Sequence, residues 1–173
     1  YKLSDLKGKM ISLGKTNSGS YRTIKKLLNL MNLKPNEYRF SHDDPAHGCD
    51  LLQQGQVDAL IMIAGNPIQC VMNLAKKMSL RFVGIEPSDF ENLKKKGAYF
   101  NLSEIKPGLY WNIGRVKTIS LGAFWVTSNE AKEKSIYDIT KAFWREQNQN
   151  KLKLSFPDLK LVSFEEIGSL DPA

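Results

Sequence analysis

The sequence predicts an α/β domain with a mostly parallel sheet flanked by helices. The hydrophobic periodicity switches repeatedly between the two-residue spacing of strands and the longer spacing of helices. The expected elements alternate along the chain, as in folds built from right-handed crossovers. Residues 57–63 form a nearly continuous apolar run, which suits a parallel strand buried on both faces. The 173 residues, 42% hydrophobic and 25% charged, suffice for one globular domain or somewhat more.

The first strand and helix are expected at residues 9–14 and 18–32. Apolar side chains in the second of these segments recur at helical spacing and therefore share one face. The next strand and helix begin with a short strand at 38–40. A helix that Asp44 caps follows this strand, because Pro45 then occupies the first helical position.

That second helix should end before Gly55, and the buried strand at 57–63 follows it. Gly65-Asn66-Pro67 then breaks the apolar run. Its asparagine is expected to cap the next helix and its proline to take the first helical position. This third helix should continue to about residue 78.

A further strand is expected at 80–85. The segment Ser88-Asp89-Phe90-Glu91 has the pattern of a capping box, which opens a helix that ends at Gly97. Residues 98–105 are expected to be extended, and Pro107-Gly108 to form a turn.

The last expected elements are a long strand at 118–127 and a long helix at 132–147. The polar residues 147–153 are expected to form a mobile connection.

The longest apolar run, residues 59–64, is much shorter than the ~20 residues of a membrane span. The chain begins without a hydrophobic leader, so we expect it to be a piece of something longer, with no signal peptide of its own.

Charge and cysteine content exclude several classes of protein. The net charge of +7 is spread thinly, and the only tight basic run is Lys94-Lys95-Lys96. Nucleic-acid binders usually concentrate charge on one face, so no nucleic-acid partner is expected. Cys49 and Cys70 fall on the apolar faces of predicted helices and are assigned to core packing. With only His42 and His47 besides, neither a metal site nor a cofactor is expected.

The loop between the first strand and the first helix is a candidate ligand site. Ligands of open α/β sheets bind outside the carboxyl ends of the strands. The first N–H groups of a helix lack internal partners and carry partial positive charge. Ser18, Gly19 and Ser20, with Lys15 beside them, therefore suit a carboxylate or another small anion. The alternative is that Asn17 or Ser18 only caps the helix.

Gly65-Asn66-Pro67 repeats this arrangement at the end of the buried strand. Two such junctions at one sheet edge would form the lips of a polar cleft. Gly14-Lys15-Thr16 does not complete a phosphate-binding loop, because that motif requires glycine where Lys9 stands. No catalytic constellation can be placed, so no catalytic residue is assigned.

Six segments of the chain form an ordered series of short motifs. They are Ser4-Asp5-Leu6-Lys7-Gly8-Lys9, Asn17-Ser18-Gly19-Ser20, the "LLQQGQVDA" run at 51–59, Ile63-Ala64-Gly65-Asn66-Pro67, Ile105-Lys106-Pro107-Gly108-Leu109-Tyr110, and "IYDITKAF" at 136–143. In this order they resemble the TAXI family of TRAP-transporter solute receptors.

The resemblance implies a type II periplasmic-binding-protein fold, in which two α/β lobes enclose a ligand. Residues 1–112 would form the second lobe, and residues 113–173 the returning strand and C-terminal helices that complete the first lobe. The opening part of the first lobe would then lie outside this chain. The strand at 118–127 would lack its partner, and its exposed edge would promote dimers.

The implied function is capture of a small organic anion, such as a carboxylate or acidic amino acid, in the periplasm. The chain would deliver this ligand to the membrane permease subunits of a TRAP-type transporter and would not be an enzyme. Tyr110 is expected to close over the ligand. Two alternatives stay open: a ligand-sensing domain of a regulator, and an enzyme acting on a small acid with Lys15 as its reactive residue.

Overall fold

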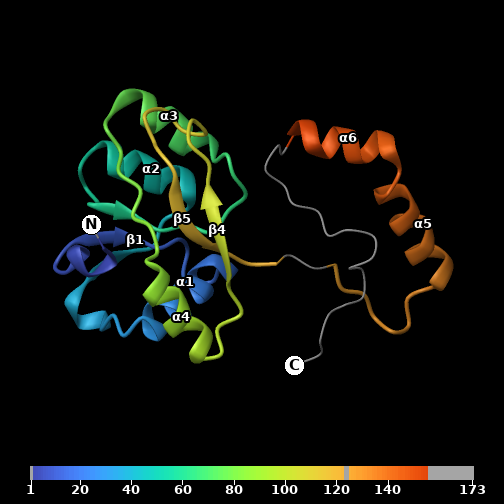
Figure 1. The fold of residues 1–173 in the computed structure, drawn as a ribbon, viewed down its shortest axis with the longest axis horizontal. Helices are drawn as coiled ribbons and strands as arrows, with labels where there is room; N and C mark the ends of the chain where they lie inside the picture. Colours follow the sequence, from blue (N-terminus) through green and yellow to red (C-terminus); the bar gives the residue numbers. More distant parts are fainter. Residues whose placement is uncertain (1, 123–124, 156–173) are drawn as a thin grey trace. The chain divides into compact units, whose positions relative to one another are not determined.

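The computed structural model describes residues 2–122 and 125–155 of the chain (Figure 1). It divides into two compact units, Tyr1–Phe124 and Trp125–Ala173. In the part of the chain that the structure describes, the first unit contains the strands and most of the helices, and the second contains two helices. Among the described residues, no helix is both long enough and apolar enough to cross a membrane.

The centre of the first unit is a three-stranded parallel sheet. Its strands are β1 (Met10–Ser12), β2 (Arg39–Ser41) and β3 (Ala59–Leu60), in the order β2-β1-β3. All pairings are parallel, which confirms the predicted α/β class with a mostly parallel sheet. The third strand is much shorter than the apolar run at 57–63 that predicted it, because only Ala59 and Leu60 in the middle of this run pair with β1.

Helix α1 (Gly19–Leu30) covers one face of this sheet, as Figure 1 shows. Its Ile24 and Leu28 are buried in one cluster with Ile11 of β1. Ser18 caps the helix by accepting the N–H of Tyr21 at 3.1 Å. The predicted helix at 18–32 is therefore confirmed in most of its length, and Ser18 is its cap.

Helix α2 (Pro45–Gln53) covers the opposite face (Figure 1). Asp44 caps it and Pro45 opens it, as predicted. Gly48 lets the helix approach the sheet closely, because a Cβ at this position would lie 2.8 Å from Leu60 Cδ1 and 3.0 Å from Ser12 Oγ. The absence of a side chain at this glycine therefore sets the distance between helix and sheet.

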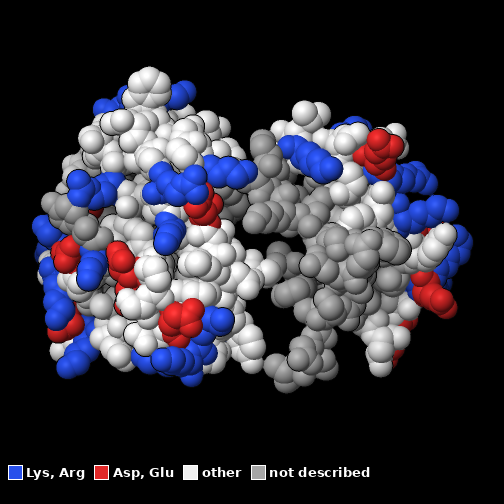
Figure 2. Space-filling view, in the orientation of Figure 1, with Lys and Arg blue, Asp and Glu red and all other residues white. Residues whose placement is uncertain are grey.

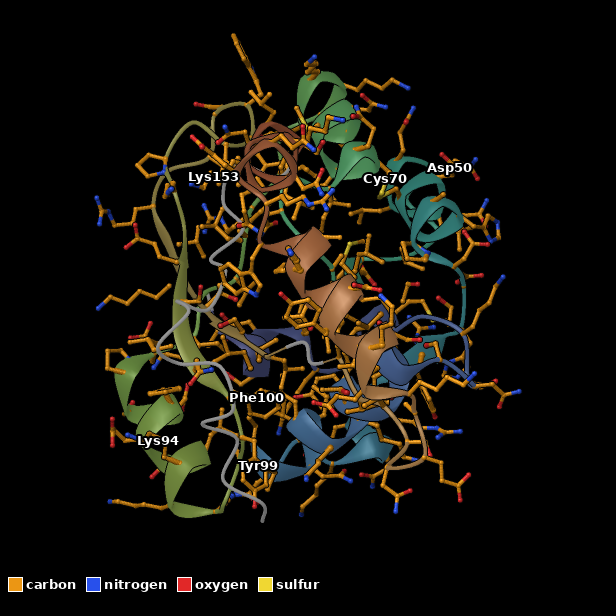
Figure 3. The ribbon with its side chains drawn as sticks, turned by 90° about the vertical axis from the view of Figure 1, so that its right-hand side faces the viewer. Asp50, Cys70, Lys94, Tyr99, Phe100 and Lys153 are labelled. Carbon is orange, nitrogen blue, oxygen red and sulfur yellow. A yellow bond between two sulfur atoms is a disulfide. The ribbon has the colours of Figure 1, made fainter. Side chains whose placement is uncertain are left out.

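Helix α3 (Gln69–Lys77) packs against α2. Cys49 of α2 and Cys70 of α3 are bonded in a disulfide (Figure 3). Cys49 is buried, as core packing predicted, but the assignment to packing alone was incomplete. The predicted cap is wrong, because α3 begins after Ile68 and not after Asn66.

Two predictions for the middle of the chain are corrected. Residues 80–85 form no strand, although the N–H of Ile85 donates to the carbonyl of Lys117 at 3.0 Å. Helix α4 (Pro87–Lys95) is present, but Glu86 is its N-cap and makes no side-chain capping bond, so the capping box is wrong. Gly97 follows the helix with φ of +70°, a conformation that ends helices and that glycine favours.

Strands β4 (Asn101–Ile105) and β5 (Val116–Ser120) form an antiparallel pair. The turn at 107–108 lies in the loop between them, as predicted. The strand predicted at 118–127 is shorter and starts earlier. The expectation that it lacks a partner in this chain is wrong, because all five residues of β5 pair with β4.

The second unit contains α5 (Glu133–Phe143) and α6 (Glu146–Ser155). Helix α5 confirms most of the predicted helix. The connection predicted at 147–153 is instead the middle of α6. Two short 3-10 turns, Leu3–Leu6 and Pro35–Glu37, complete the elements of the described chain.

Candidate functional site

A hollow of about 110 Å³ lies where the strands of the parallel sheet end. We call it the strand-end cleft, and its lining consists of Leu13, Gly14, Lys15, Ser18, Ser20, Asp43, Asp44, Pro45, Leu60, Ile61, Met62 and Ile63. These residues lie at the end of β3 or follow β1, β2 and β3, so the cleft occupies the edge where open α/β sheets bind ligands. The volume is below the ~300 Å³ of drug-sized pockets, which suits a solute or group of few heavy atoms.

The N-terminus of α1 forms one side of the strand-end cleft. The hydroxyl of Ser20 donates to the carbonyl of Ile63 at 3.4 Å, which joins the helix to the segment after β3. Gly14 has φ of +88° and turns the chain out of β1 toward the helix. Three of the predicted site residues, Lys15, Ser18 and Ser20, thus lie together at this edge.

The N-terminus of α2 forms another side. Asp44 accepts the N–H of His47 at 3.0 Å and lies 3.6 Å from the ammonium group of Lys15. The hydrogen bond from His47 and, to a lesser degree, the charge of Lys15 hold the pKa of Asp44 below its usual range. Asp44 is therefore charged at neutral pH and partly neutralises the positive charge of Lys15.

Asp43 was not predicted as a site residue. Its Oδ1 lies 3.1 Å from Nδ1 of His47, while its Oδ2 is buried and has no hydrogen-bond partner among the described residues. The sequence did contain a signal, because two consecutive aspartates stand between an expected strand and an expected helix.

Gly65, Asn66 and Pro67 lie outside the lining of the strand-end cleft, on the chain that leaves it. Gly65 is exposed, and the other two are half-buried. The Oδ1 of Asn66 accepts the hydroxyl of Tyr110 at 2.7 Å, and that hydroxyl accepts the N–H of Ile68 at 2.9 Å. The side chain of Asn66 therefore accepts a hydrogen bond from Tyr110 and does not cap a helix.

Tyr110 lies in the core and not over the cleft. Its exposed fraction is 1%, and its ring packs 5.0 Å from that of Phe82. Burial raises the pKa of its hydroxyl, although the N–H of Ile68 opposes this effect. The expectation that Tyr110 closes over a ligand does not agree with this placement, and its visible role is to hold the segment after β3.

A comparison with protein families gives a match that spans nearly the whole chain. The family model for the NMT1-like family matches residues 1–172. The chain belongs to the NMT1-like family. Members of this family are periplasmic solute-binding proteins that serve transport, and the family is typically extracytoplasmic.

For this NMT1-like chain, the Cys49–Cys70 disulfide agrees with the typical location of the family. Disulfides persist in oxidising compartments such as the periplasm and are rare in the cytosol. The bond joins α2, which carries Asp44 at its start, to the first turn of α3. It thereby ties together the two helices that follow the outer strands of the sheet, β2 and β3.

Charge in this NMT1-like chain is mixed on the surface as well as in the cleft. Figure 2 shows basic side chains scattered over the visible face of the first unit, with acidic ones between them. The charged residues of the cleft lining are Lys15, Asp43 and Asp44. Within the described ranges, no group of three or more His, Cys, Asp or Glu side chains is placed to hold a metal ion.

Proposed function

We propose that this chain is a solute-binding receptor that captures a small organic anion in the strand-end cleft for a TRAP-type membrane transporter. The observation that carries the proposal is the position of Lys15 and the first turn of α1 at the ends of three parallel strands. Helix N-termini favour anions, because their N–H groups lack internal acceptors. Membership of a solute-binding family supports the same reading.

The residues around the start of α1 have distinct roles in this proposal, including Gly19, which lies between the lining residues Ser18 and Ser20 in the chain. The N–H groups of Gly19 and Ser20 would receive the anionic group of the solute. Lys15 is exposed and its contact with Asp44 is long, so it can turn to a carboxylate without breaking a buried pair. Ser18 is occupied by its capping bond and positions the turn.

The segment Gly65-Asn66-Pro67 would form the opposite lip, and Tyr110 would keep that lip in place through Asn66. Residues 1–112 would be the second lobe of a two-lobed receptor, and residues 113–173 would belong to the first. Closure of two such lobes on a ligand is a hinge motion. The ordered TAXI-like motifs and the disulfide support a periplasmic receptor of this kind and a permease as its partner.

Thermal unfolding with a panel of small carboxylates tests the proposal. A ligand at 1,000 times its dissociation constant adds about 4 kcal/mol to the free energy of unfolding, which raises Tm visibly. Lys15→Ala should weaken binding of the hit several-fold, and Lys26→Ala, which removes the same charge from an exposed position of α1, should not. Equal affinity of the two variants, or a shift only with duplex DNA, would contradict the proposed site.

A further inference from the structure

We infer that the exposed Trp111 and two lysines beside it, Lys76 and Lys77, form a surface that binds an anionic membrane. The observation that carries the inference is a hollow of about 280 Å³, which Trp111 lines together with the end of α3, where both lysines stand. We call these three side chains the basic tryptophan surface. They do not line the strand-end cleft, so the inference does not depend on solute binding there.

Trp111 stands at the corner of a tight turn that two buried residues anchor. The N–H of Ile113 donates to the carbonyl of Tyr110 at 3.2 Å, and both of these residues are buried. The other corner residue, Asn112, has φ of +56°, a conformation that asparagine tolerates in turns. The turn therefore holds Trp111 at the surface, where it is 71% exposed. Tryptophan is enriched at interfaces where one end of the indole is buried and the other stays wet.

The sequence around this turn is basic. Among the described residues that line the hollow, none is acidic. The segments 59–85 and 105–122, which meet at the hollow, contain no aspartate or glutamate. Their basic residues are Lys76, Lys77, Arg81, Lys106, Arg115 and Lys117. Figure 2 agrees with this distribution, because the visible end of the first unit that carries α3 in Figure 1 shows basic and uncharged side chains, and the visible acidic ones lie further from it.

The end of α3 accounts for the two lysines only in part. Lys76 and Lys77 lie in the last turn of the helix, where cations complement the partial negative charge of the C-terminus. This effect does not require an aromatic side chain beside them. The ammonium group of Lys77 donates to Oε1 of Gln53 at 3.4 Å, and this neutral partner leaves the positive charge in place. Both lysines are exposed, so an anionic surface can approach them.

A membrane fits these residues better than an acidic protein segment does. Protein interfaces are depleted in lysine and enriched in arginine, and their strongest tryptophans fill pockets in the partner. Here the cations that line the hollow are lysines, and the indole is exposed on a turn. Tryptophan is enriched at the level of lipid headgroups, and each basic residue near an anionic membrane adds to the attraction. Such attraction would keep a receptor that serves transport close to the membrane.

The basic run Lys94-Lys95-Lys96, followed by the exposed Tyr99, provides a comparison within the chain. Helix α4, which carries the start of this run, lies at the end of the first unit opposite α3 (Figures 1 and 3). Glu91 precedes the run in the same helix, and the ammonium group of Lys96 donates to the carbonyl of Leu30. This run is partly balanced by acidic charge and partly used inside the protein, so we expect it not to bind a membrane.

Co-sedimentation of the full chain with lipid vesicles tests the inference. One set of vesicles contains equal parts of phosphatidylglycerol and phosphatidylcholine, and the other contains phosphatidylcholine alone. We expect the chain to bind only the anionic vesicles and to be released by high salt, which screens exposed charges. Tryptophan fluorescence should shift to shorter wavelength on binding, and Trp111→Ala should lose this shift.

The lysines are tested by the double variant Lys76→Gln with Lys77→Gln. It should bind the anionic vesicles about 25-fold more weakly, because each lysine near such a surface contributes about 5-fold. Lys25→Gln with Lys26→Gln is the matched control, since it removes two adjacent exposed charges from α1. This control should bind nearly as well as the wild type. An equal loss in both double variants would show that binding follows net charge, and this result would overturn the proposed surface.

The indole is tested by Trp111→Ala, which should bind several-fold more weakly. Tyr99→Ala removes another exposed aromatic side chain and should bind as the wild type does. Unchanged binding by Trp111→Ala, or no binding of the wild type to anionic vesicles at low salt, would overturn the inference. Binding of soluble poly-L-glutamate without binding of vesicles would also overturn it, in favour of an acidic protein segment. None of these results concerns the strand-end cleft, so the proposed function is tested separately.

Discussion

The hydroxyl of Tyr110 donates to Oδ1 of Asn66 at 2.7 Å, although 44 residues separate them in the chain. The same hydroxyl accepts the N–H of Ile68 at 2.9 Å. One buried side chain thus fixes the segment between β3 and α3 at two points. This segment is the proposed lip of the strand-end cleft, so a core residue would hold that lip in place.

Replacing Tyr110 with phenylalanine should therefore affect both stability and binding. The change leaves the ring in place but removes both hydrogen bonds, and buried groups without partners cost about 1–3 kcal/mol. Denaturant unfolding should show a loss of this size, and calorimetry a weaker solute affinity. Tyr99→Phe is the control, because that side chain is 75% exposed, and an equal loss there would contradict this explanation.

A substitution at Gly48 tests how closely α2 must pack on the sheet. Gly48→Ala places a Cβ 2.8 Å from Leu60 Cδ1, which is closer than real contacts allow. Overpacking of this kind typically costs about 1–3 kcal/mol, so the free energy of unfolding should fall by that amount. Gly114→Ala meets nothing within 4 Å and should leave stability nearly unchanged. A neutral Gly48→Ala would mean that the helix can move away from the sheet at little cost.

The sequence predicted correctly those parts of the fold that depend on residues close together in the chain. The starts of α1 and α2 follow from Ser18 and from Asp44 with Pro45, because a capping bond spans only three residues. The order of strand and helix in the first 60 residues follows from periodicity alone. The α/β class and the parallel sheet are consequences of these local features.

The errors in the sequence-based prediction arise where contacts between residues distant in the chain determine the structure. Asn66 has the sequence of a helix cap, but the hydroxyl of Tyr110 takes its side chain. The length of β5 is set by its pairing with β4 and not by its own apolar run. In the cleft, Lys15, Ser18 and Ser20 were predicted from one loop, whereas Asp43 required knowing that the segment after β2 reaches the same hollow.

The disulfide should make a large contribution to stability. Cys49 and Cys70 are 21 residues apart in the chain, and a closed loop of that size is worth about 3 kcal/mol through the entropy of the unfolded state. Adding reductant should lower the free energy of unfolding by about that amount. The double variant Cys49→Ala with Cys70→Ala should not respond to reductant. A wild-type protein that is equally stable in both conditions would contradict this role.

The last prediction concerns Asp58 and acid stability. Its Oδ2 accepts the N–H of Met10 at 2.8 Å, while its own N–H donates to the carbonyl of Met10 at 2.8 Å, so the two residues hold β1 beside β3. The hydrogen bond from Met10, with a smaller contribution from Lys9, lowers the pKa of Asp58. A carboxyl whose pKa is lower in the folded state stabilises the protein above its unfolded pKa and loses this effect as the pH falls through the folded pKa.

Asp58→Asn should therefore be less stable than the wild type at pH 7. The difference should persist down to about pH 4, the usual range of an aspartate, and disappear below it as the wild-type carboxyl is protonated. Urea unfolding at pH values from 7 to 2 measures this convergence. Asp50→Asn, at an exposed position of α2, should follow the wild-type profile throughout. A constant difference between Asp58→Asn and the wild type across this range would show that the charge of Asp58 does not stabilise the pairing of β1 and β3.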